Sequence, residues 1–522
     1  MGRVVNEFCM VQRRRVRRRT DGGPRPSGVL SFTPSPPVTG KKNTVLFLTD
    51  CAHGLSKVHV ATTLALLQKY PSVDIHYASF PMLKGELQRV SDAANSKSAE
   101  ARPIQWHELR GPSFIAAAMR TWGDATGLIA PPGVAGSEKL LRDFELVASP
   151  WTADELWDLY CQMKELIERI DPAVVVLDSM LRPAMDVSRS LNRTRVVLSP
   201  NALTDLLAGM QPWGAPFWKY PALGSGFPFP LPWRLVLANV YLQLRLIYGV
   251  VFSPALAAKR RFLSDKGVRD PMPLVDVKFP EAPWISMAFP EAGLPLDFIP
   301  SHVMPVGPIV LDVATADKQD EELASWLKRA PTVLVNLGSA VEYDERMARE
   351  MAGALATVLE STNTQVLWKL QKACEFSDGA LEPVEEHIKS GRLRIESWLD
   401  VDPVSLLQTG DIILSVHHGG ANCYHEAILT GVPQVILPLW VDLYNFAQIA
   451  EYLGVGIWPG KDTAPMWYAE VLSDGFVRAL TGESSVAMKK RARELEAVAR
   501  RYGGQRAAAE KIARMAASGR EC

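Results

Sequence analysis

Cysteine is scarce in this sequence, and its spacing excludes two common kinds of site. No two cysteines form a Cys-x-x-Cys pair, so neither a disulfide framework nor a zinc site is indicated. The six cysteines among the 522 residues are Cys9, Cys51, Cys161, Cys374, Cys423 and Cys522. A reducing, cytoplasmic setting is the expectation that follows.

An excess of charge of either sign is absent as well. Lysine and arginine together number 57, aspartate and glutamate together also number 57, and the formal net charge is therefore zero. Such a balance gives no indication of a nucleic-acid partner or of a strongly acidic one. We expect the partners of this chain to be recognised by local sites rather than by a global field.

The chain also lacks an uninterrupted apolar run of the roughly 20 residues that a membrane-spanning helix needs. Residues 231–254 come nearest, but they include Arg234, Asn239, Gln243 and Arg245. Tryptophan, leucine, valine and tyrosine recur there at helical spacing, which predicts an amphipathic helix. Two interpretations are left open: packing against the first domain, or peripheral contact with a membrane surface.

Residues 1–42 lack the apolar content that a folded core requires. Six arginines lie between positions 13 and 19, and Pro, Gly and Ser dominate residues 22–37. Such a segment cannot bury enough apolar area to offset its ordering entropy, so it is expected to be disordered. No apolar stretch follows the arginines, and a secretory signal is therefore not expected. The arginine run is interpreted either as a solvated tail or as a targeting or anionic-lipid-binding element.

Apolar strands that alternate with helices make up much of the remaining chain. The length and the 47% hydrophobic content predict two domains with sizeable cores. Apolar runs at 44–49 and 173–177 predict buried parallel strands, each followed by a helix, and a second series of this kind starts at Thr332. This order predicts an α/β fold with two doubly wound parallel sheets, whose ligands lie at the carboxyl ends of the strands.

The segment around the paired glycines at 419–420 has the pattern of an anion-binding loop. A strand-like run, 411–416, precedes these glycines, which let the backbone approach an anion closely. A helix that starts near Asn422 would direct free N–H groups at that anion, and a pyrophosphate fits this geometry. Glu426, about one turn into the helix, can accept hydrogen bonds from a ribose, and Asp442 can meet sugar hydroxyls.

This segment resembles the donor-binding signature of UDP-dependent glycosyltransferases, the family that includes plant, bacterial and animal small-molecule glucosyl- and glucuronosyltransferases. Four further segments come in that family's order and near its spacing, and ordered matches of this number rarely arise by chance. They are Ser-Trp-Leu at 325–327, Val-Leu-Val-Asn-Leu-Gly-Ser at 333–339, Val-Leu-Trp-Lys at 366–369 and Ser-Trp-Leu at 397–399. The resemblance covers residues 43–510 and implies the GT-B fold, in which two Rossmann-like doubly wound domains face each other across a cleft.

The resemblance also implies a division of the chain. After the disordered segment 1–42, an acceptor-binding Rossmann-like domain is expected at 43–295 and a linker at 296–320. A UDP-sugar donor-binding Rossmann-like domain is expected at 321–484. The C-terminal segment 485–522 would form a helix that crosses back to the first domain.

For the donor phosphates, the resemblance implies a set of contacts at the anion-binding loop. His418 matches the family's phosphate-binding histidine, and Gly420 belongs to the loop that follows it. Asn422 and Cys423 stand where an asparagine and a serine normally meet the phosphates. Cysteine in place of serine keeps the backbone donor and weakens the side-chain donor.

The remaining donor contacts are implied by matches elsewhere in the second half. Gly338 and Ser339 close a strand and would bring a backbone group and a hydroxyl to the phosphate or the reacting centre. Trp398 matches the aromatic residue on which the uracil stacks, Glu426 matches the ribose ligand, and Asp442 would hold the sugar.

The identity of the sugar stays open, because two positions depart from the family's pattern. Leu443 follows Asp442 where many relatives have a glutamine, so one hydrogen-bonding partner of the sugar is lost. Ala421 replaces the usual tryptophan and leaves more room near the donor. UDP-glucose is the first expectation.

The residues expected to remove the acceptor's proton match the family's pattern less closely. In the resembling family a histidine just after the first strand is the base, and an aspartate at the end of a later strand orients it. Asp178 takes the place of that aspartate. The family's Gly-His order is inverted here, because His53 precedes Gly54, and the following helix carries His59. His53 is the expected base, with His59 and a mechanism without a histidine base as alternatives.

No metal ion or other cofactor is expected to take part. His418 and a helix N-terminus would neutralise the phosphates in place of a cation held by carboxylates. Adjacent histidines such as His417 and His418 lie on opposite sides of a strand and rarely face one ion, so a metal site with His425 is not favoured. His417 and His425 are expected in surface or packing positions.

The sequence therefore predicts an inverting, metal-independent UDP-sugar transferase that moves a hexose, glucose by first expectation, to a hydroxyl of a lipophilic small molecule. A secondary metabolite, a sterol or a glycolipid precursor would suit the Trp- and Pro-rich residues 201–295, the expected acceptor region. Two alternatives stay open: a sugar-nucleotide epimerase of the same fold, and a catalytically inactive UDP-sugar-binding subunit. The expected location is cytoplasmic, with peripheral membrane contact through residues 231–254 as the open alternative.

Overall fold

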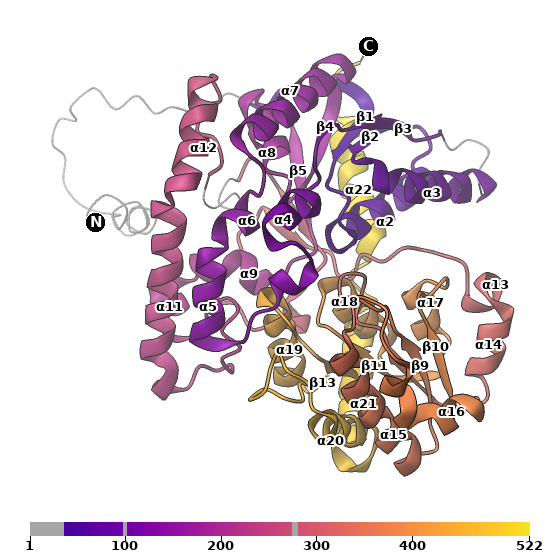
Figure 1. Cartoon of the computed structure of the whole chain (residues 1–522). Helices are drawn as coiled ribbons and strands as arrows, with labels where there is room; N and C mark the ends of the chain where they lie inside the picture. Colours follow the sequence, from indigo (N-terminus) through magenta and orange to yellow (C-terminus); the bar gives the residue numbers. More distant parts are fainter. Residues whose placement is uncertain (1–35, 98–101, 274–279, 522) are drawn as a thin grey trace, which may run out of the picture. The chain divides into compact units, whose positions relative to one another are not determined.

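Two parallel sheets form the framework of the computed structural model, which describes residues 36–97, 102–273 and 280–521 (Figure 1). The strand order is β3-β2-β1-β4-β5-β6-β7 in the first sheet and β10-β9-β8-β11-β12-β13 in the second. Every strand pair in the described part of the chain is parallel. The predicted α/β fold with two doubly wound sheets is confirmed.

All strands of the first sheet precede those of the second sheet in the sequence. The first sheet contains β1 (Lys41–Leu48), β2 (Asp74–Ser79), β3 (Gln105–Glu108), β4 (Pro172–Asp178), β5 (Arg195–Ser199), β6 (Trp284–Ser286) and β7 (Val303–Pro305). The second sheet contains β8 (Thr332–Val335), β9 (Gln365–Lys369), β10 (Leu393–Glu396), β11 (Ile412–His417), β12 (Gln434–Ile436) and β13 (Gly456–Ile457).

Helices connect these strands in both halves. Those that precede β8 are α2 (His53–Lys69), α3 (Lys84–Lys97), α4 (Phe114–Trp122), α5 (Gly133–Arg142), α6 (Phe144–Ala148), α7 (Ala153–Ile170), α8 (Arg182–Ser190), α9 (Leu203–Leu207), α10 (Ala215–Trp218), α11 (Trp233–Phe252), α12 (Pro254–Asp265), α13 (Ala316–Gln319) and α14 (Glu321–Leu327). Those that follow are α15 (Glu345–Ser361), α16 (Glu385–Lys389), α17 (Pro403–Gln408), α18 (Ala421–Thr430), α19 (Val441–Tyr452), α20 (Ala469–Leu480), α21 (Gly482–Ala499) and α22 (Gly504–Ala517).

The central strands of the first sheet are buried along almost their whole length. β4 has no exposed residue, and the apolar end of β1 is equally closed to solvent. Continuous runs of Val, Leu and Phe suit this position, because crossover helices cover a parallel sheet on both faces. This is why an apolar run without alternation was sufficient to predict both strands.

The order of strands reverses at one point in each sheet. In the first sheet β1 lies next to β4, and in the second β8 lies next to β11, although other strands separate each pair in the sequence. At such a switch point the connections leave in opposite directions and a crevice opens at the carboxyl ends of the strands. The loops after β1, β4, β8 and β11 are therefore the positions where a ligand should be sought.

The first sheet extends beyond both of the boundaries that the sequence suggested. β7 pairs with β6, although it lies within residues 296–320, which were assigned to a linker. Near the other end, Val38 bridges Arg193, and β1 begins at Lys41, so residues 38–42 pair with the sheet. The remainder of the segment predicted to be disordered, up to residue 35, lies outside the described residues.

The C-terminal part of the chain packs on the first sheet. α22 lies against α2, β4 and β1, and its alanines and isoleucine belong to the core of that sheet. The predicted continuous helix from residue 485 is broken into α21 and α22. The break falls at Gly503 and Gly504, which have positive φ, and a Cβ at Gly504 would collide with the Pro308 carbonyl oxygen at 2.1 Å.

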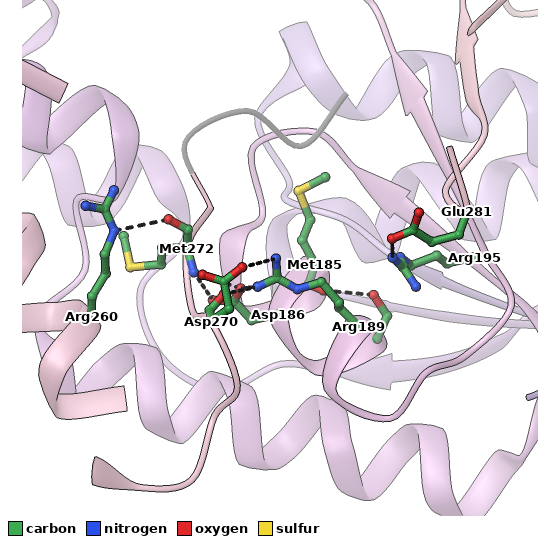
Figure 2. Close-up of polar contacts among 9 residues, drawn as sticks. Met185, Asp186, Arg189, Arg195, Arg260, Asp270, Met272 and Glu281 are labelled. Atoms are coloured by element: carbon green, nitrogen blue, oxygen red, sulfur yellow. Dashed lines mark hydrogen bonds and ion pairs between the residues drawn. The ribbon is translucent and has the colours of Figure 1, made fainter. Parts of the chain in front are cut away.

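The segment that follows α12 is fixed to α8 by a polar network (Figure 2). The Asp186 carboxylate accepts hydrogen bonds from the Met272 backbone N–H at 2.9 and 3.1 Å and from Arg189 at 2.9 Å. Arg189 also forms an ion pair with Asp270 at 3.7 Å, and Arg260 of α12 donates to the Met272 carbonyl at 3.2 Å. The end of α12 is thereby held against the first sheet.

Candidate active site

Asp178 lies at the end of β4, where the first sheet reverses its strand order. Its carboxylate accepts hydrogen bonds from the backbone N–H groups of Asp50 at 3.2 Å and Met180 at 2.8 Å. Burial raises the pKa of Asp178 to about 7; the bond from Met180 opposes this rise and the Asp50 carboxyl group adds to it. Asp178 thus joins the loops after β1 and β4, and its charge changes near neutral pH.

His53, the expected base, is the first residue of α2 and its side chain is about half exposed. Its Nδ1 atom lies 3.9 Å from the Glu86 Oε2 atom of α3. Within the described residues, no hydrogen bond or ion pair joins His53 to Asp178. The structure therefore does not bring the predicted pair into contact, because backbone N–H groups occupy both Asp178 oxygens and His53 faces α3.

His59, the alternative base, is a core residue. It is fully buried, neither ring nitrogen has a hydrogen-bond partner among the residues that the structure describes, and its ring meets the Phe47 ring edge-on at 6.4 Å. Burial lowers the pKa of His59 to about 3. A base must touch the proton that it removes, and a side chain without solvent access cannot do so. The alternative assignment to His59 is wrong for this reason.

His418, directly after β11, lies between two glycines that leave room for its ring. A Cβ at Gly338 would lie 2.5 Å from the His418 Cε1 atom, and a Cβ at Gly420 would lie 2.6 Å from Cε1 and Nε2. The ring is also 5.9 Å from the Trp440 ring. These glycines were expected to admit an anion to the backbone, and they also make space for the imidazole.

The charge of His418 bears on the electrostatic role predicted for it. Burial lowers its pKa to about 3, so the imidazole is neutral at pH 7. A neutral ring can donate one N–H hydrogen bond to an anion but brings no positive charge. Its Nδ1 atom is buried and has no hydrogen-bond partner in the described part of the chain, so the ring retains unused hydrogen-bonding capacity.

The first turn of α18 contacts the first turn of α2, which follows the loop after β1. The Asn422 side-chain amide donates hydrogen bonds to the backbone carbonyls of His53 at 3.4 Å and Gly54 at 3.3 Å. Gly420 is the N-cap of α18, so the free N–H groups of the first turn point towards this contact. The predicted anion site and the expected base thus lie on touching segments of the two halves.

A lysine of the first half interacts electrostatically with the predicted ribose ligand. Glu426 is buried in α18, and burial raises its pKa while Lys57 of α2 opposes the rise. Burial lowers the pKa of Lys57, whereas electrostatic attraction to Glu426 and then to Cys423 raises it. The summed attraction is the larger effect, so the pKa of Lys57 is raised overall. Cys423 itself is a free thiol whose pKa burial raises to about 12, so it remains protonated. Lys57 therefore places a positive charge beside the first turn of α18.

A second lysine lies between the predicted uracil and phosphate positions. The Lys369 Nζ atom donates to the Gly338 carbonyl at 2.8 Å and lies 3.7 Å from the centre of the Trp398 ring. Burial lowers the pKa of Lys369 to about 8. Trp398 is about half exposed, so it keeps apolar ring surface available for stacking, and Ser339 beyond Gly338 is exposed.

Asp442, the predicted sugar ligand, has a carboxylate neighbour from the first half. It lies in the first turn of α19, and burial raises its pKa to about 6. Burial raises the pKa of Asp205 of α9 to about 7, and the nearby Asp442 carboxylate adds to this rise. Asp205 also accepts a hydrogen bond from Asn445 at 2.6 Å. Leu443 is buried, so the position that is often glutamine in relatives faces the core here.

The two other histidines of the signature have partners inside the fold. His417 pairs with the Gln434 side chain at 2.8 Å and accepts from the Gly419 backbone N–H at 3.0 Å. His425 bonds to the Ala421 carbonyl at 2.8 Å. The expected packing role is confirmed for both residues.

Sequence reasoning missed Lys57, Lys369 and Asp205. Lys57 is four residues after His53, a spacing that puts both on one face of a helix and could have indicated it. Lys369 ends a segment that matched the family, and the pairing of β8 with β9 brings it near Gly338. For Asp205 the sequence carries no signal, because its neighbour Asp442 lies in the other half of the chain.

Comparison with known proteins agrees with this arrangement. Residues 389–495 match the model for the erythromycin biosynthesis protein CIII-like C-terminal domain. Glycosyltransferase sdnJ of Sordaria araneosa is 34% identical over 436 residues, which are 81% of this chain and 84% of sdnJ. A UDP-glucose:anthocyanidin 3-O-glucosyltransferase solved in complex with UDP has a TM-score of 0.56 and 16% identity, covering 92% of this chain and 100% of that one. CalG4, the calicheamicin glycosyltransferase, has a TM-score of 0.57 and 15% identity, covering 91% and 98%.

The solved structures establish the class of fold, which is GT-B, with the site residues at the switch points of two Rossmann-like sheets. Because the sequence identity to these structures is low, the similarity shows a shared fold and nothing more. The identity to sdnJ, which extends over most of both chains, establishes more. The chain belongs to the UDP-glycosyltransferase family and is a glycosyltransferase.

Proposed function

We propose that this protein transfers a hexose, glucose by first expectation, from a UDP-sugar to a hydroxyl of a lipophilic small molecule, with inversion and without a metal ion. The observation that carries the proposal is the contact between Asn422 and the His53–Gly54 backbone. It brings the segment that would bind the leaving diphosphate against the segment that would remove the acceptor proton. The acceptor proton can then be removed, and the charge of the leaving diphosphate stabilised, within one site.

In the proposed reaction, His53 removes the acceptor's hydroxyl proton while the acceptor oxygen attacks the anomeric carbon and the bond to the diphosphate breaks. Asp178, near the same loop, would stabilise the resulting imidazolium. The negative charge on the leaving UDP would meet the first-turn N–H groups of α18, the neutral N–H of His418, and the cations Lys57 and Lys369. The two lysines supply the positive charge that a partly buried, neutral His418 does not.

The acceptor class rests on the character of the first half and on the names of similar proteins. Residues 211–254 are rich in Trp, Pro and aliphatic side chains. Among the similar proteins, one is named a UDP-glucose flavonoid 3-O-glucosyltransferase, of Fragaria ananassa, and another is titled an anthocyanidin 3-O-glucosyltransferase. A secondary metabolite, a sterol or a glycolipid precursor is the proposed acceptor. The proposed location is the cytoplasm, with peripheral contact between residues 231–254 and a membrane.

The decisive experiment offers several UDP-sugars to the purified full chain, with and without a panel of lipophilic alcohols and phenols. We expect UDP release that depends on the acceptor, together with an adduct one hexose heavier by mass spectrometry. UDP binding without any turnover would favour a catalytically inactive binding subunit. Conversion of the UDP-sugar to its epimer, without an adduct, would favour the epimerase alternative.

Affinity for UDP is expected to fall as the pH rises from about 7 to about 9.5. Lys369 is charged below its pKa of about 8 and neutral above it, so its attraction for the diphosphate is lost as the pH rises. Lys369→Arg keeps its charge over this range, and its affinity should fall much less. Titration calorimetry with UDP at both pH values measures the effect. An equal fall in both proteins would mean that another group titrates.

A further inference from the structure

The outer face of α11 is apolar and open to solvent. Trp233 and Leu237 are 85% and 82% exposed, and further exposed side chains continue the same stripe at intervals of three or four residues. Those further residues are Tyr241, Leu244, Tyr248 and Phe252. Only Asn239 and Leu242 are buried in this 20-residue helix. We refer to these six exposed side chains as the α11 stripe.

Three polar side chains of α11, those of Asn239, Gln243 and Arg245, form hydrogen bonds within the protein. Figure 1 shows α5 alongside α11, and from it Glu138 accepts hydrogen bonds from Tyr241 at 2.7 Å and Arg245 at 2.8 Å. Asn239 accepts from the Ala222 backbone N–H at 2.7 Å and donates to the Tyr220 carbonyl at 2.9 Å. A helix on a water-soluble surface shows the reverse pattern, with apolar residues towards the core. The inversion indicates that the outer face has an apolar partner.

Another exposed tryptophan, Trp213, lies in the turn that precedes α10. It is 85% exposed in the 3₁₀ turn η4 (Pro212–Gly214), and the next helix, α10, packs on α11. Its φ of 61° and ψ of 25° are left-handed values that bulky side chains rarely adopt. Trp218, also exposed, donates to the Trp213 carbonyl at 3.1 Å and holds this turn. A strained backbone that presents a tryptophan to solvent favours a functional surface.

The charges next to the α11 stripe select the kind of partner. α11 contains no aspartate or glutamate, and Arg234 is exposed at its start. At its other end α12 carries exposed Arg261 and the single acid Asp265, while Lys266, after the helix, lies over the rings of Trp157 and Phe262. Aromatic and aliphatic side chains flanked by cations suit the boundary between acyl chains and anionic headgroups. They do not suit a basic or a purely polar protein surface.

The helix is placed to lie on a membrane rather than to cross it. In the described part of the chain, the segment Trp233–Asp265 is long and apolar enough to span a bilayer, and 11% of its apolar window is buried. Crossing, however, would require Arg245 to leave Glu138 and Asn239 to lose its backbone partners. The network around Asp186 also holds the end of α12 against the first sheet (Figure 2). These contacts hold the inner face of α11 and the end of α12 in place, so the outer face of α11 is the one that can contact a membrane.

We propose that the α11 stripe docks on the surface of an anionic phospholipid membrane, with α11 lying in the plane of the interface. The apolar side chains enter the headgroup–acyl boundary, and Arg234 and Arg261 meet the lipid phosphates. Docking itself is independent of the glycosyl transfer. One consequence does rest on the proposed function: a lipophilic acceptor dissolved in the membrane would reach the first half without passing through water.

Co-sedimentation of the full chain with vesicles tests the proposal. We expect binding to vesicles of about three parts phosphatidylcholine to one part phosphatidylserine, and weaker binding to phosphatidylcholine alone or at high salt. The double variant Trp233→Glu/Leu237→Glu should lose at least about tenfold in affinity for the anionic vesicles. Val486→Glu, which changes an exposed side chain of α21 in the same way, should bind normally.

Circular dichroism and UDP binding of each variant confirm that it has folded, and they make the vesicle result independent of whether the enzyme transfers sugar. Absence of binding to anionic vesicles would overturn the proposal. So would binding that survives the double variant, whether it comes from the arginines at 13–19 or from another surface. A dimer in solution that the double variant dissociates, with no vesicle binding by the wild type, would instead identify the stripe as an interface between copies of this chain.

Discussion

Replacing Asp178 by asparagine is expected to lower the rate of glycosyl transfer by about 10²- to 10⁴-fold, the usual contribution of proton-transfer catalysis. The carboxylate accepts from the backbone N–H groups of Asp50 and Met180. An asparagine amide can accept on one side only, so one tie between the loops is lost together with the negative charge. Affinity for UDP should stay within about twofold, because these bonds all lie in the first half. UDP release and titration calorimetry measure the two quantities.

The pH profile of the wild type gives an independent check on the charge of Asp178. Its pKa of about 7 means that the carboxylate becomes neutral as the pH falls through 7, so the rate should fall there. Asparagine does not titrate, so the residual rate of the variant should lack the part of this fall that Asp178 causes. A wild-type rate that is flat between about pH 6 and 8 would contradict a role for the charge.

Glu86 is the residue to compare with Asp178, because it is the carboxylate that faces His53 in the structure. His53→Ala should lose activity to the same extent as Asp178→Asn if His53 is the base. Glu86→Gln should retain most of the rate if Asp178 stabilises the imidazolium, and should lose it if Glu86 does. Full activity in His53→Ala would show that the base has been assigned wrongly.

The second large effect is expected from Gly420→Ala, which should weaken UDP binding by about tenfold or more, or ~1.4 kcal/mol for each factor of ten. The added Cβ would lie 2.6 Å from the His418 ring, and Gly338 closes the other side of that ring. The imidazole must therefore leave the position from which it can donate to a phosphate. Calorimetric titration with UDP provides the measurement.

A glycine with free space around it is the matched control for Gly420. A Cβ at Gly85, in α3, meets no atom within 4 Å, so Gly85→Ala should leave UDP affinity unchanged. Thermal denaturation of both variants shows whether Gly420→Ala has lost its fold instead of its site. Normal UDP affinity in a folded Gly420→Ala protein would refute the assignment of His418 to the phosphates.

The framework could be predicted where local sequence determines it. β1, β4 and β11 are apolar runs that parallel strands require whatever surrounds them. β6 and β7 could not be predicted, because strands of three residues show no periodicity and are defined by the neighbours with which they pair. The break before α22 is likewise set by the closeness of Pro308 to Gly504, which is a tertiary contact.

The residues of the candidate site also fall into those that the sequence could place and those that it could not. His418 and Asn422 lie in one short segment, so the motif placed them together near a helix start. The expected contact between His53 and Asp178 spans two elements and depends on side-chain direction, which sequence spacing does not fix. Lys369 acquired a role only when β9 was placed beside β8. Positions set by one segment could be predicted, and contacts between segments could not.

The return of α22 to the first sheet affects how the protein can fold during synthesis. Domains usually fold in the order in which they leave the ribosome. Here the core around β1 and β4 includes Ala508, Ile512 and Ala516 of α22, which are made after the entire second sheet. The half of the protein that is translated first must therefore wait, with part of its apolar surface uncovered, until α22 has been translated. A nascent chain stalled before α22 would be a natural target for chaperones.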